Sequence, residues 1–479
     1  MTHGGCAEGC DLGLIGVGVM GGNFVLNLSD HGYSAAVYDV TREKTLEFME
    51  KQATGRDIRA GFSLGEFVGL LRKSRAIMLL VPAGAPVDAV IEDLVPLLDP
   101  GDLIIDSGNS HFTDTDRREK SLEERGLLFM GMGISGGEQG ARYGPSLMPG
   151  GPGEGYERVR PLLDAAAARV NGESCVAYMG KGSAGHYVKM VHNGIEYGLM
   201  QLISEAYDLM KRGLGLSNDD LHAIYERWSR AELNGYLMEI TAHIFRRGDE
   251  RNAERFLIDA ILDQAGQKGT GMWMTEDAMS LRVPTPNIDA AVMMRHLSGR
   301  LAERRKASEV LRGPEACFRG DRDDFTGRIG NALYAGMIMT YGQGMALLQE
   351  ASRAYGYGLD LEVVARIWRG GCIIRATLLE DVRTAFRNRP ELPNLLLDPR
   401  LSGEIAERQA DLRAVVRAAT ELGVPVPGMM ASLAYFDACR SAWLPANLIQ
   451  AQRDYFGAHT YERVDAEGVF HTHWSEGEG

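Results

Sequence analysis

Short apolar runs alternate with longer amphipathic segments up to about residue 180. Five runs of four or five residues are rich in Val, Ile, Leu or Met, a composition typical of strands buried on both faces of a parallel sheet. These runs span residues 12–15, 35–38, 77–81, 103–106 and 127–130. The intervening segments are long enough for crossover helices, so the pattern predicts a doubly wound α/β domain over residues 1–182.

Beyond residue 180 the periodicity becomes helical. In one segment the apolar residues recur at spacings of three and four, which places them on one helix face and is typical of a buried core helix. They are Tyr334, Ile338, Tyr341, Met345 and Leu348. Residues 183–442 are therefore predicted to form a large all-α domain. The C-terminal tail, 443–479, has too little apolar surface to fold alone, so we expect it to dock on the body or on a second subunit.

The composition excludes several classes of partner. The chain has 479 residues, 45% of them hydrophobic, which is enough for two or three domains with apolar cores. Its net charge is −14 and it has no block of Lys or Arg, so we expect neither a nucleic-acid surface nor a membrane surface. The most apolar later stretch is broken by Tyr341 and Gln343, and is too polar to span a bilayer. An anionic substrate remains compatible, because a pocket can be locally basic in an acidic protein.

The cysteines and the N-terminus indicate a cytoplasmic protein. Six scattered cysteines form no disulfide framework in so long a chain, which fits a reducing compartment. The first residues have neither a basic nor an apolar region, so no signal peptide is predicted. Cys6 and Cys10 are the only close pair, and a mobile polar N-terminus is favoured there over a metal site.

The first apolar run leads into G-V-G-V-M-G, with Gly16, Gly18 and Gly21 at the spacing of a dinucleotide-binding turn. The first glycine permits a tight turn, the second admits the pyrophosphate, and the third lets the helix pack on the strand. An ordinary glycine-rich turn is the alternative. The preceding strand, the following helix and Asp39, 23 residues after Gly16, together favour a Rossmann dinucleotide site.

Asp39 bears on the choice of cofactor. Its carboxylate can accept hydrogen bonds from both ribose hydroxyls of NAD, whereas a 2′-phosphate there costs about 3 kcal/mol per charge pair at about 5 Å. The sequence therefore favours NAD. NADP remains the alternative because Arg42 is a nearby cation, and Asp39 could instead be a turn residue that caps the next helix.

The segment K-M-V-H-N-G-I-E-Y, 189–197, is the candidate reacting centre. On a helix Lys189, Asn193 and Glu196 lie within a narrow arc of one face, flanked by His192 and Tyr197. A solvated ion pair is the alternative, but the apolar and small residues on either side favour a buried site.

Three further stretches carry candidate chemistry. Ser135, Gly136 and Gly137 form a small-residue turn whose N–H groups could meet an anion, with an ordinary loop as the alternative. Lys268 lies among glycines in A-G-Q-K-G-T-G. Arg453 and His459 lie in the polar tail.

These motifs resemble the 6-phosphogluconate dehydrogenase family. The resemblance rests on S-G-G-E-Q-G-A-R-Y-G-P-S-L-M-P-G-G, G-H-Y-V-K-M-V-H-N-G-I-E-Y-G, A-G-Q-K-G-T-G and P-A-N-L-I-Q-A-Q-R-D-Y-F-G-A-H-T-Y-E, and it runs from about Asp11 to the end. It implies oxidative decarboxylation of 6-phosphogluconate to ribulose 5-phosphate and carbon dioxide, with reduction of NAD or NADP.

The resemblance also implies roles for the residues of 189–197. Lys189 would take the hydroxyl proton during hydride transfer, which requires a lowered pKa, and would then stabilise the enolate, so that no metal is needed. Glu196 would protonate the enediol carbon. Asn193 and His192 would orient the sugar hydroxyls and the nicotinamide.

The same resemblance distributes the binding residues. Ser135, Gly136 and Gly137 would hold the carboxylate end, and the phosphate would be bound by Tyr197, Lys268, Arg295 and Arg453. The tail would pass into the partner of an obligate homodimer, so that Arg453 and His459 serve the neighbouring site. The cofactor residues would be Gly16, Gly18, Val19, Met20, Gly21, Asp39, Val40, Thr41, Val81, Pro82, Ala83 and Asn109.

The chain departs from the family pattern at three places. NADP-using members usually carry Asn-Arg-Thr where this chain has Asp39-Val40-Thr41. Pro82 and Met272 also stand where lysines are common. Two other functions are compatible with parts of the sequence: a different β-hydroxyacid dehydrogenase, such as one acting on 3-hydroxyisobutyrate, and a catalytically inactive nucleotide-binding protein.

Overall fold

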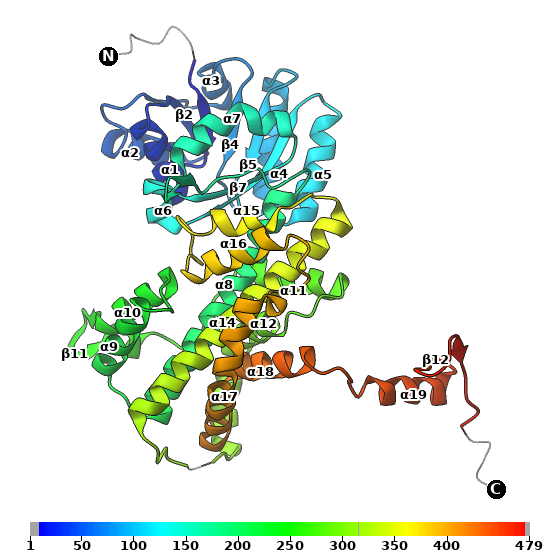
Figure 1. Cartoon of the computed structure of the whole chain (residues 1–479). Helices are drawn as coiled ribbons and strands as arrows, with labels where there is room; N and C mark the ends of the chain where they lie inside the picture. The colour runs from blue at the N-terminus through cyan, green and yellow to red at the C-terminus, as the bar shows by residue number, and fades with distance from the viewer. Residues whose placement is uncertain (1–8, 315, 475–479) are drawn as a thin grey trace. The chain divides into compact units, whose positions relative to one another are not determined.

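The computed structural model describes residues 9–314 and 316–474. The chain divides into two compact units, Met1–Ser432 and Leu433–Gly479. The first unit begins with an α/β Rossmann domain and continues as a helical body, which confirms the predicted fold class (Figure 1). Of the cysteine pair expected to be part of a mobile N-terminus, Cys6 lies outside the described residues. The expectation was wrong for Cys10, which is buried and donates its N–H to the carbonyl of Leu70 at 2.8 Å.

The Rossmann sheet has seven strands in the order β3-β2-β1-β4-β5-β6-β7. The first six are parallel, and β7 pairs antiparallel with β6 at the edge. Three of the expected strands have the predicted bounds, while β4 ends two residues earlier and β6 extends further than expected. The sequence analysis missed β3 and β7. The strands are β1 Leu12–Ile15, β2 Ala35–Tyr38, β3 Ile58–Ala60, β4 Ala76–Leu79, β5 Leu103–Asp106, β6 Leu128–Ser135 and β7 Ser146–Gly150.

Alternate residues of these strands enter two separate apolar cores, one on each face of the sheet. Leu14, Met78 and Ile105 pack into one core together with Phe24. Their strand neighbours, including Ile77, pack into the other core. Each buried aliphatic side chain stabilises the fold by about 1.5–3 kcal/mol. Because these strands are buried on both faces, both sets of alternate residues are apolar, and the strands appear as continuous apolar runs.

Helices cover both faces of the sheet. Apolar residues of α1, α2 and α7 belong to the first core, and those of α3, α4 and α5 belong to the second. The helices of this domain are α1 Val19–Asp30, α2 Arg42–Lys51, α3 Leu64–Gly69, α4 Ala85–Leu94, α5 Phe112–Glu123, α6 Gly137–Tyr143 and α7 Gly153–Ala166, and the short η1 covers Val95–Leu97.

The helical body is built around two long helices, α8 and α14, which pack against each other (Figure 1). The predicted apolar face of α14 is buried throughout. The elements of this body are α8 Ala184–Asp208, η2 Leu209–Gly213, α9 Asn218–Ser229, α10 Tyr236–Arg246, η3 Leu257–Ala260, α11 Thr270–Ser280, α12 Pro286–Ser298, α13 Leu301–Val310, α14 Arg322–Tyr355, α15 Leu361–Ile367, α16 Leu378–Asn388, η4 Leu395–Leu397 and α17 Pro399–Leu422, with the short strand pair β10 Gly248–Asp249 and β11 Asn252–Phe256. The pair β8 Arg169–Val170 and β9 Glu173–Ser174 precedes the body, and α18 Pro427–Cys439 runs across the boundary between the two units.

The first turns of α8 lie directly against strands β6 and β7. A Cβ atom on Gly185 would meet the carbonyl oxygens of Gly131 and Met148 at 2.2 and 2.3 Å, so only glycine permits this approach. Farther along, the Cβ of Lys189 lies beside Gly133 of β6. The crossing therefore fixes where Lys189 stands relative to the end of the sheet.

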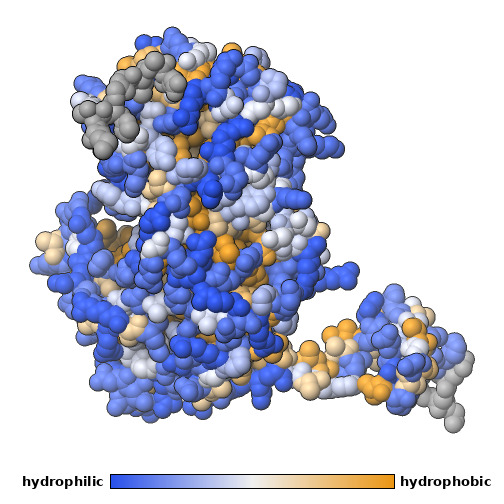
Figure 2. Space-filling view, turned by 45° about the horizontal axis from the view of Figure 1, so that its top comes forward, coloured by the Kyte–Doolittle hydropathy of each residue, from blue (hydrophilic) through white to orange (hydrophobic). Residues whose placement is uncertain are grey.

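The second unit holds α19 Ala446–Gly457 and a short pair, β12 Tyr461–Glu462 with β13 Val469–Phe470. The buried carboxylate of Asp454 joins these parts, accepting hydrogen bonds from the backbone N–H groups of Thr460 and Thr472 and from the Trp474 indole at 2.8–3.0 Å. Apolar side chains nevertheless lie on the surface of this unit (Figure 2). Those largely exposed include Trp443, Leu448, Ile449, Tyr455 and Phe456. The sequence analysis did not predict α19.

No helix in the described part of the chain combines the length and the apolar character that crossing a bilayer requires.

Candidate active site

The dinucleotide-binding turn lies at the carboxyl end of β1, beside the point where the strand order reverses between β1 and β4. Gly16 has a φ of +101°, which disfavours other residues, and α1 begins at Val19. The helix N-terminus thus presents free N–H groups at the crevice where such sheets bind dinucleotides. The predicted residues Val81, Pro82 and Ala83 follow β4, and Asn109 follows β5.

Asp39 lies at the tip of β2, where its carboxylate braces the glycine-rich turn. One carboxylate oxygen accepts the N–H of Val17 inside the glycine-rich turn at 3.0 Å, and the other accepts the N–H of Thr41 at 2.9 Å. Thr41 is the N-cap of α2. Asp39 therefore holds the residue that starts this helix, although its side chain is not itself the cap. Each oxygen retains a second lone pair for a ribose hydroxyl.

The neighbouring cation, Arg42, points its guanidinium at an aromatic ring. Its central carbon lies 4.4 Å from the centroid of the Phe62 ring. Val40, between Asp39 and Thr41, is 75% exposed. The ribose end of the turn therefore presents a carboxylate and an exposed valine, with Arg42 stacked on an aromatic neighbour.

A cavity of about 550 Å³ lies between the Rossmann domain and the helical body. It collects residues from seven separate segments of the chain, so long-range folding brings the predicted residues together. The predicted residues that line it are Met20, Asn109, Ser135, Gly136, Gly137, Lys189, Asn193, Glu196, Tyr197, Lys268 and Arg295. The cavity is also lined by five residues that were not predicted: Ile134, Gly266, Gln267, Thr270 and Ile373.

Lys189, Asn193 and Glu196 face this cavity from one side of α8, as their spacing predicted. Burial lowers the pKa of Lys189, although the Glu196 carboxylate opposes that shift. Burial raises the pKa of Glu196, opposed by Lys189 and Arg295. The same desolvation thus favours a neutral amine and a neutral carboxylic acid side by side.

His192 lies behind these groups and is fully buried. Its Nε2 atom is 3.0 Å from Ser135 Oγ and 2.9 Å from Cys372 Sγ. Its Nδ1 atom is 3.0 Å from Asn193 Oδ1 and 3.5 Å from Lys189 Nζ. Burial, and then the charge on Lys189, hold the pKa of His192 well below its usual value, so the ring is neutral and connects Ser135 to Lys189.

Cys372 is the contact that the sequence analysis missed. Burial raises the pKa of its thiol to about 12, so it stays protonated. The sequence analysis assigns no role to Cys372, which is one of six scattered cysteines. The sole sequence signal was its position in G-G-C-I-I-R, a small and apolar segment 180 residues from its partner His192.

Two cations, Lys268 and Arg295, are among the lining residues of the cavity. The guanidinium of Arg295 stacks on the Tyr197 ring, 3.6 Å from its centroid, and donates to the carbonyl of Gly266 at 2.9 Å. Lys268 lines the cavity from the same loop. Met272, which replaces a lysine common in the family, packs against the apolar cluster of Tyr197, Ala291 and Val292. These groups suit a phosphate dianion.

The Ser135–Gly137 turn also lines the cavity. Gly136 has a φ of +119°, and a Cβ there would meet the carbonyl oxygen of Gly371 at 2.7 Å. The N–H of Ile373 donates to Ser135 Oγ at 3.2 Å, which fixes the hydroxyl beside the cavity. Arg453 and His459 belong to the second unit, so the structure does not test their predicted place in this site.

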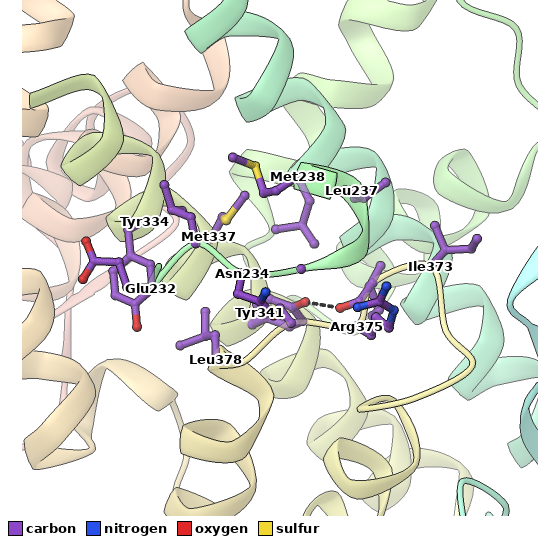
Figure 3. A pocket seen from close by; sticks show the side chains of 15 residues that line it. Glu232, Asn234, Leu237, Met238, Tyr334, Met337, Tyr341, Ile373, Arg375 and Leu378 are labelled. Carbon is purple, nitrogen blue, oxygen red and sulfur yellow. Dashed lines mark hydrogen bonds between the residues drawn. The ribbon is translucent and has the colours of Figure 1, made fainter. Parts of the chain in front are cut away.

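A second hollow, of about 20 Å³, lies between α10, α14 and the 373–376 segment (Figure 3). Its walls are mainly Leu, Met and Ile side chains, and the Tyr341 hydroxyl donates to the Ile374 carbonyl at 2.6 Å. Arg375 also lines this hollow, and its guanidinium is paired with the Glu239 carboxylate. We therefore assign it to packing and place the chemistry in the larger cavity.

Comparisons with known proteins agree with this geometry. Residues 11–180 match the NAD binding domain of 6-phosphogluconate dehydrogenase, and 185–474 match its C-terminal domain. The decarboxylating 6-phosphogluconate dehydrogenase of Synechococcus elongatus is 54% identical, covering 96% of this chain and 98% of the relative. The NADP(+)-dependent decarboxylating enzyme of Bacillus subtilis is 49% identical, covering 97% and 98%.

A solved structure of Plasmodium falciparum 6-phosphogluconate dehydrogenase has the same fold. It covers 97% of this chain and 100% of its own, with a TM-score of 0.92 and 42% identity. The Plasmodium falciparum enzyme was solved in its apo form, in complex with its cofactor NADP+ and in complex with its substrate 6-phosphogluconate. Since both family models match and the relatives correspond over nearly their whole length, the chain belongs to the 6-phosphogluconate dehydrogenase family of decarboxylating, NAD(P)-dependent oxidoreductases.

Proposed function

We propose that the chain carries out its family's oxidative decarboxylation of 6-phospho-D-gluconate with Lys189 and Glu196 as the two proton-transferring groups. The observation that carries the proposal is their position on one face of α8 in a single cavity, where burial shifts both toward neutrality. The product is D-ribulose 5-phosphate, with release of carbon dioxide. A spectrophotometric assay tests it directly: formation of no reduced nicotinamide from 6-phosphogluconate with either cofactor would contradict it.

The bound nicotinamide supplies the hydride acceptor. Met20 and Asn109 from the Rossmann domain line the same cavity as Lys189, so the residues present fit a dinucleotide whose ring reaches the substrate. Neutral Lys189 removes the proton of the 3-hydroxyl as the hydride leaves that carbon. The resulting β-keto acid is ready to lose its carboxylate as carbon dioxide.

Protonated Lys189 then donates to the ketone oxygen while the carbon–carbon bond breaks. This stabilises the negative charge that develops on the oxygen of the enediolate. Glu196, still protonated because burial raises its pKa, delivers a proton to the terminal carbon and leaves ribulose 5-phosphate. Neutral His192, held by Ser135 and Cys372, orients Lys189 and Asn193 throughout.

The cavity orients a substrate with one charged group at each end. Lys268 and Arg295 with Tyr197 bind the phosphate, and Ser135, Gly136 and Gly137 bind the carboxylate. This orientation brings the middle of the sugar chain to Lys189 and Glu196.

In the same proposal, Arg453 and His459 come from the partner of a homodimer, and the exposed apolar residues of the second unit are covered by that partner. A cytoplasmic location, supported by the cysteine usage, belongs to it as well.

NAD is the cofactor that the ribose end of the site favours. A 2′-phosphate would lie close to the Asp39 carboxylate, which has no cation among its hydrogen-bond partners. Arg42 stacks on Phe62, so recruiting it to a phosphate would cost this contact. The Bacillus subtilis relative is NADP(+)-dependent, so the preference of this chain rests on its own residues.

Restoring the family's usual pair tests this preference. The double variant Asp39→Asn, Val40→Arg removes one negative charge and adds one cation at the ribose. We expect the ratio of kcat/KM for NAD to that for NADP to fall by about a hundredfold or more. Asp39→Asn removes a repulsion of about 3 kcal/mol with the 2′-phosphate, and Val40→Arg adds an attraction of similar size. Arg42→Gln is the control for rescue by the neighbouring cation. A wild-type ratio that strongly favours NADP, and that Arg42→Gln removes, would contradict the proposal.

The pH profile tests the roles of Lys189 and Glu196. Lys189 must be neutral, so the rate falls as pH drops below its pKa; Glu196 must be protonated, so the rate falls as pH rises above its own. We expect a bell-shaped profile whose two limbs belong to the coupled pair. Glu196→Gln should lower kcat about a hundredfold and remove the alkaline limb.

Glu205 provides a matched control for Glu196. It lies on α8, and burial raises its pKa to about 7, but it accepts hydrogen bonds from the N–H groups of Gly428 and Met429, outside the cavity. Glu205→Gln should leave the shape of the pH–rate profile unchanged. If the alkaline limb disappears in Glu205→Gln and persists in Glu196→Gln, Glu196 is not the acid.

A further inference from the structure

Arg118, on α5, is a buried cation that the proposed chemistry does not use. It is 2% exposed, yet all five of its N–H groups have acceptors. Nε and Nη2 donate to the two oxygens of Asp88 at 2.8 and 3.1 Å, and Nη2 also donates to the carbonyl of Gly84 at 3.1 Å. Nη1 donates to Asp106 Oδ2 and to Ser110 Oγ, both at 3.2 Å.

These acceptors lie on or next to the two loops that leave the sheet beside the dinucleotide-binding turn. Gly84 ends the loop after β4, which carries Val81, Pro82 and Ala83, and Asp88 lies in the first turn of α4, which follows that loop. Asp106 and Ser110 enclose the loop after β5, which carries Asn109, a residue that lines the catalytic cavity. One guanidinium thus spans both loops.

The hydrogen bonds within the loop after β5 depend on the carboxylate of Asp106. Asp106 is fully buried; its second oxygen accepts the N–H of Gly108 at 3.0 Å, while Oδ2 also accepts the Ser110 hydroxyl at 2.6 Å. A Cβ on Gly108 would lie only 3.2 Å from the carbonyl oxygen of Val81, so the loops are in close contact. Without Arg118, Asp106 would be a buried charge with no cation, which the loops could relieve only by moving.

We propose that Arg118 is a positioning residue that holds the loops of 81–84 and 107–110 in one fixed arrangement for the nicotinamide half of the cofactor. Arg118 is not among the residues that line the catalytic cavity. Its effect passes through Asn109 and the 81–83 segment, so it concerns cofactor affinity and the placement of the ring. The inference rests on the proposed cofactor site, but it concerns binding and can be measured without turnover.

Lysine is the informative replacement at this position. Arg118→Lys keeps one positive charge beside Asp88 and Asp106 but has three donors on one atom, which cannot span acceptors on two loops. We expect the dissociation constant of the full-length enzyme for reduced cofactor, followed by its fluorescence, to rise about tenfold or more. The KM for the cofactor should rise with it, while the KM for 6-phosphogluconate stays within about twofold.

Arg117→Gln is the matched control, because Arg117 also pairs with Asp88 but is 57% exposed and reaches neither Asp106 nor Ser110. It should leave cofactor affinity unchanged. A folded Arg118→Lys enzyme with unchanged cofactor affinity would overturn the proposal, as would equal weakening of cofactor and substrate. If Arg118→Lys does not fold, Asp88→Asn decides: it removes the paired bonds to one loop and should weaken the cofactor selectively. Absence of turnover in wild type that still binds cofactor would instead count against the proposed function.

Discussion

Replacing Lys189 with alanine is expected to lower kcat by about a thousandfold or more while the cofactor still binds. The lysine serves twice: as the base that takes the hydroxyl proton and as the acid that stabilises the enediolate. General acid–base catalysis contributes about 10²–10⁴-fold in each such role. No other described side chain combines its position in the cavity with a pKa lowered toward neutrality, so nothing replaces it.

Burial explains why Lys189 can act as a base. A lysine in water is almost entirely protonated at neutral pH and is a poor base. Lys189 is 6% exposed and is packed against β6, so its charge is poorly solvated and its pKa falls. Because the same environment keeps Glu196 protonated, removing Lys189 disturbs both groups, and the loss in rate should exceed that of Glu196→Gln.

The measurement separates chemistry from binding. Initial rates at saturating substrate give kcat, and titration with reduced cofactor gives a dissociation constant that should change less than about threefold, because the dinucleotide turn lies on another domain. Lys189→Met, which fills the space of the lysine stem, shows whether a cavity left by alanine contributes. Lys211→Ala is the control, since Lys211 donates to Asn218 away from the site. Retention of more than a few per cent of activity in both Lys189 variants would exclude lysine as the base.

Local patterns predicted the parts of this protein that depend on neighbours in sequence. The parallel strands are buried on both faces, so they appear as continuous apolar runs such as those at residues 12–15 and 103–106. The arc of Lys189, Asn193 and Glu196 follows from helical geometry alone, and the cavity contains all three. The glycine-rich turn was predictable because its backbone conformation restricts the choice of residue at Gly16.

Contacts between distant segments were not predictable in the same way. β7 is an antiparallel edge strand whose sequence, S-L-M-P-G, contains proline and glycine and lacks an apolar run. Cys372 meets His192 only because the segment around residue 372 folds back against α8. The bonds that Asp39 makes to Val17 and Thr41 show a further limit: the residue type led to the prediction of a ribose ligand, but it did not indicate that the carboxylate braces the glycine-rich turn.

Deletion of the C-terminal tail is the second change for which we expect a large loss of activity. Deleting residues 443–479 is expected to abolish both dimerisation and activity, because the deletion removes Arg453 and His459 together with exposed apolar side chains such as Ile449 and Phe456. Size-exclusion chromatography with light scattering and the rate assay measure the two losses. A fully active truncated monomer would contradict the shared site. Loss of both properties alone does not show which subunit the tail serves, so a complementation experiment is needed.

Two inactive variants distinguish the possibilities when their chains are co-expressed with different affinity tags. Lys189→Ala removes the base, and Arg453→Ala removes the proposed phosphate ligand of the tail. If each tail serves the partner's cavity, a mixed dimer has one site lacking both residues and one complete site. Random pairing should then restore about a quarter of wild-type activity, and the purified mixed dimer about half. If each tail serves its own subunit, every site in the mixed dimer lacks one residue and activity stays at the level of the single variants. Substantial activity in Arg453→Ala alone would show that the phosphate does not depend on this arginine.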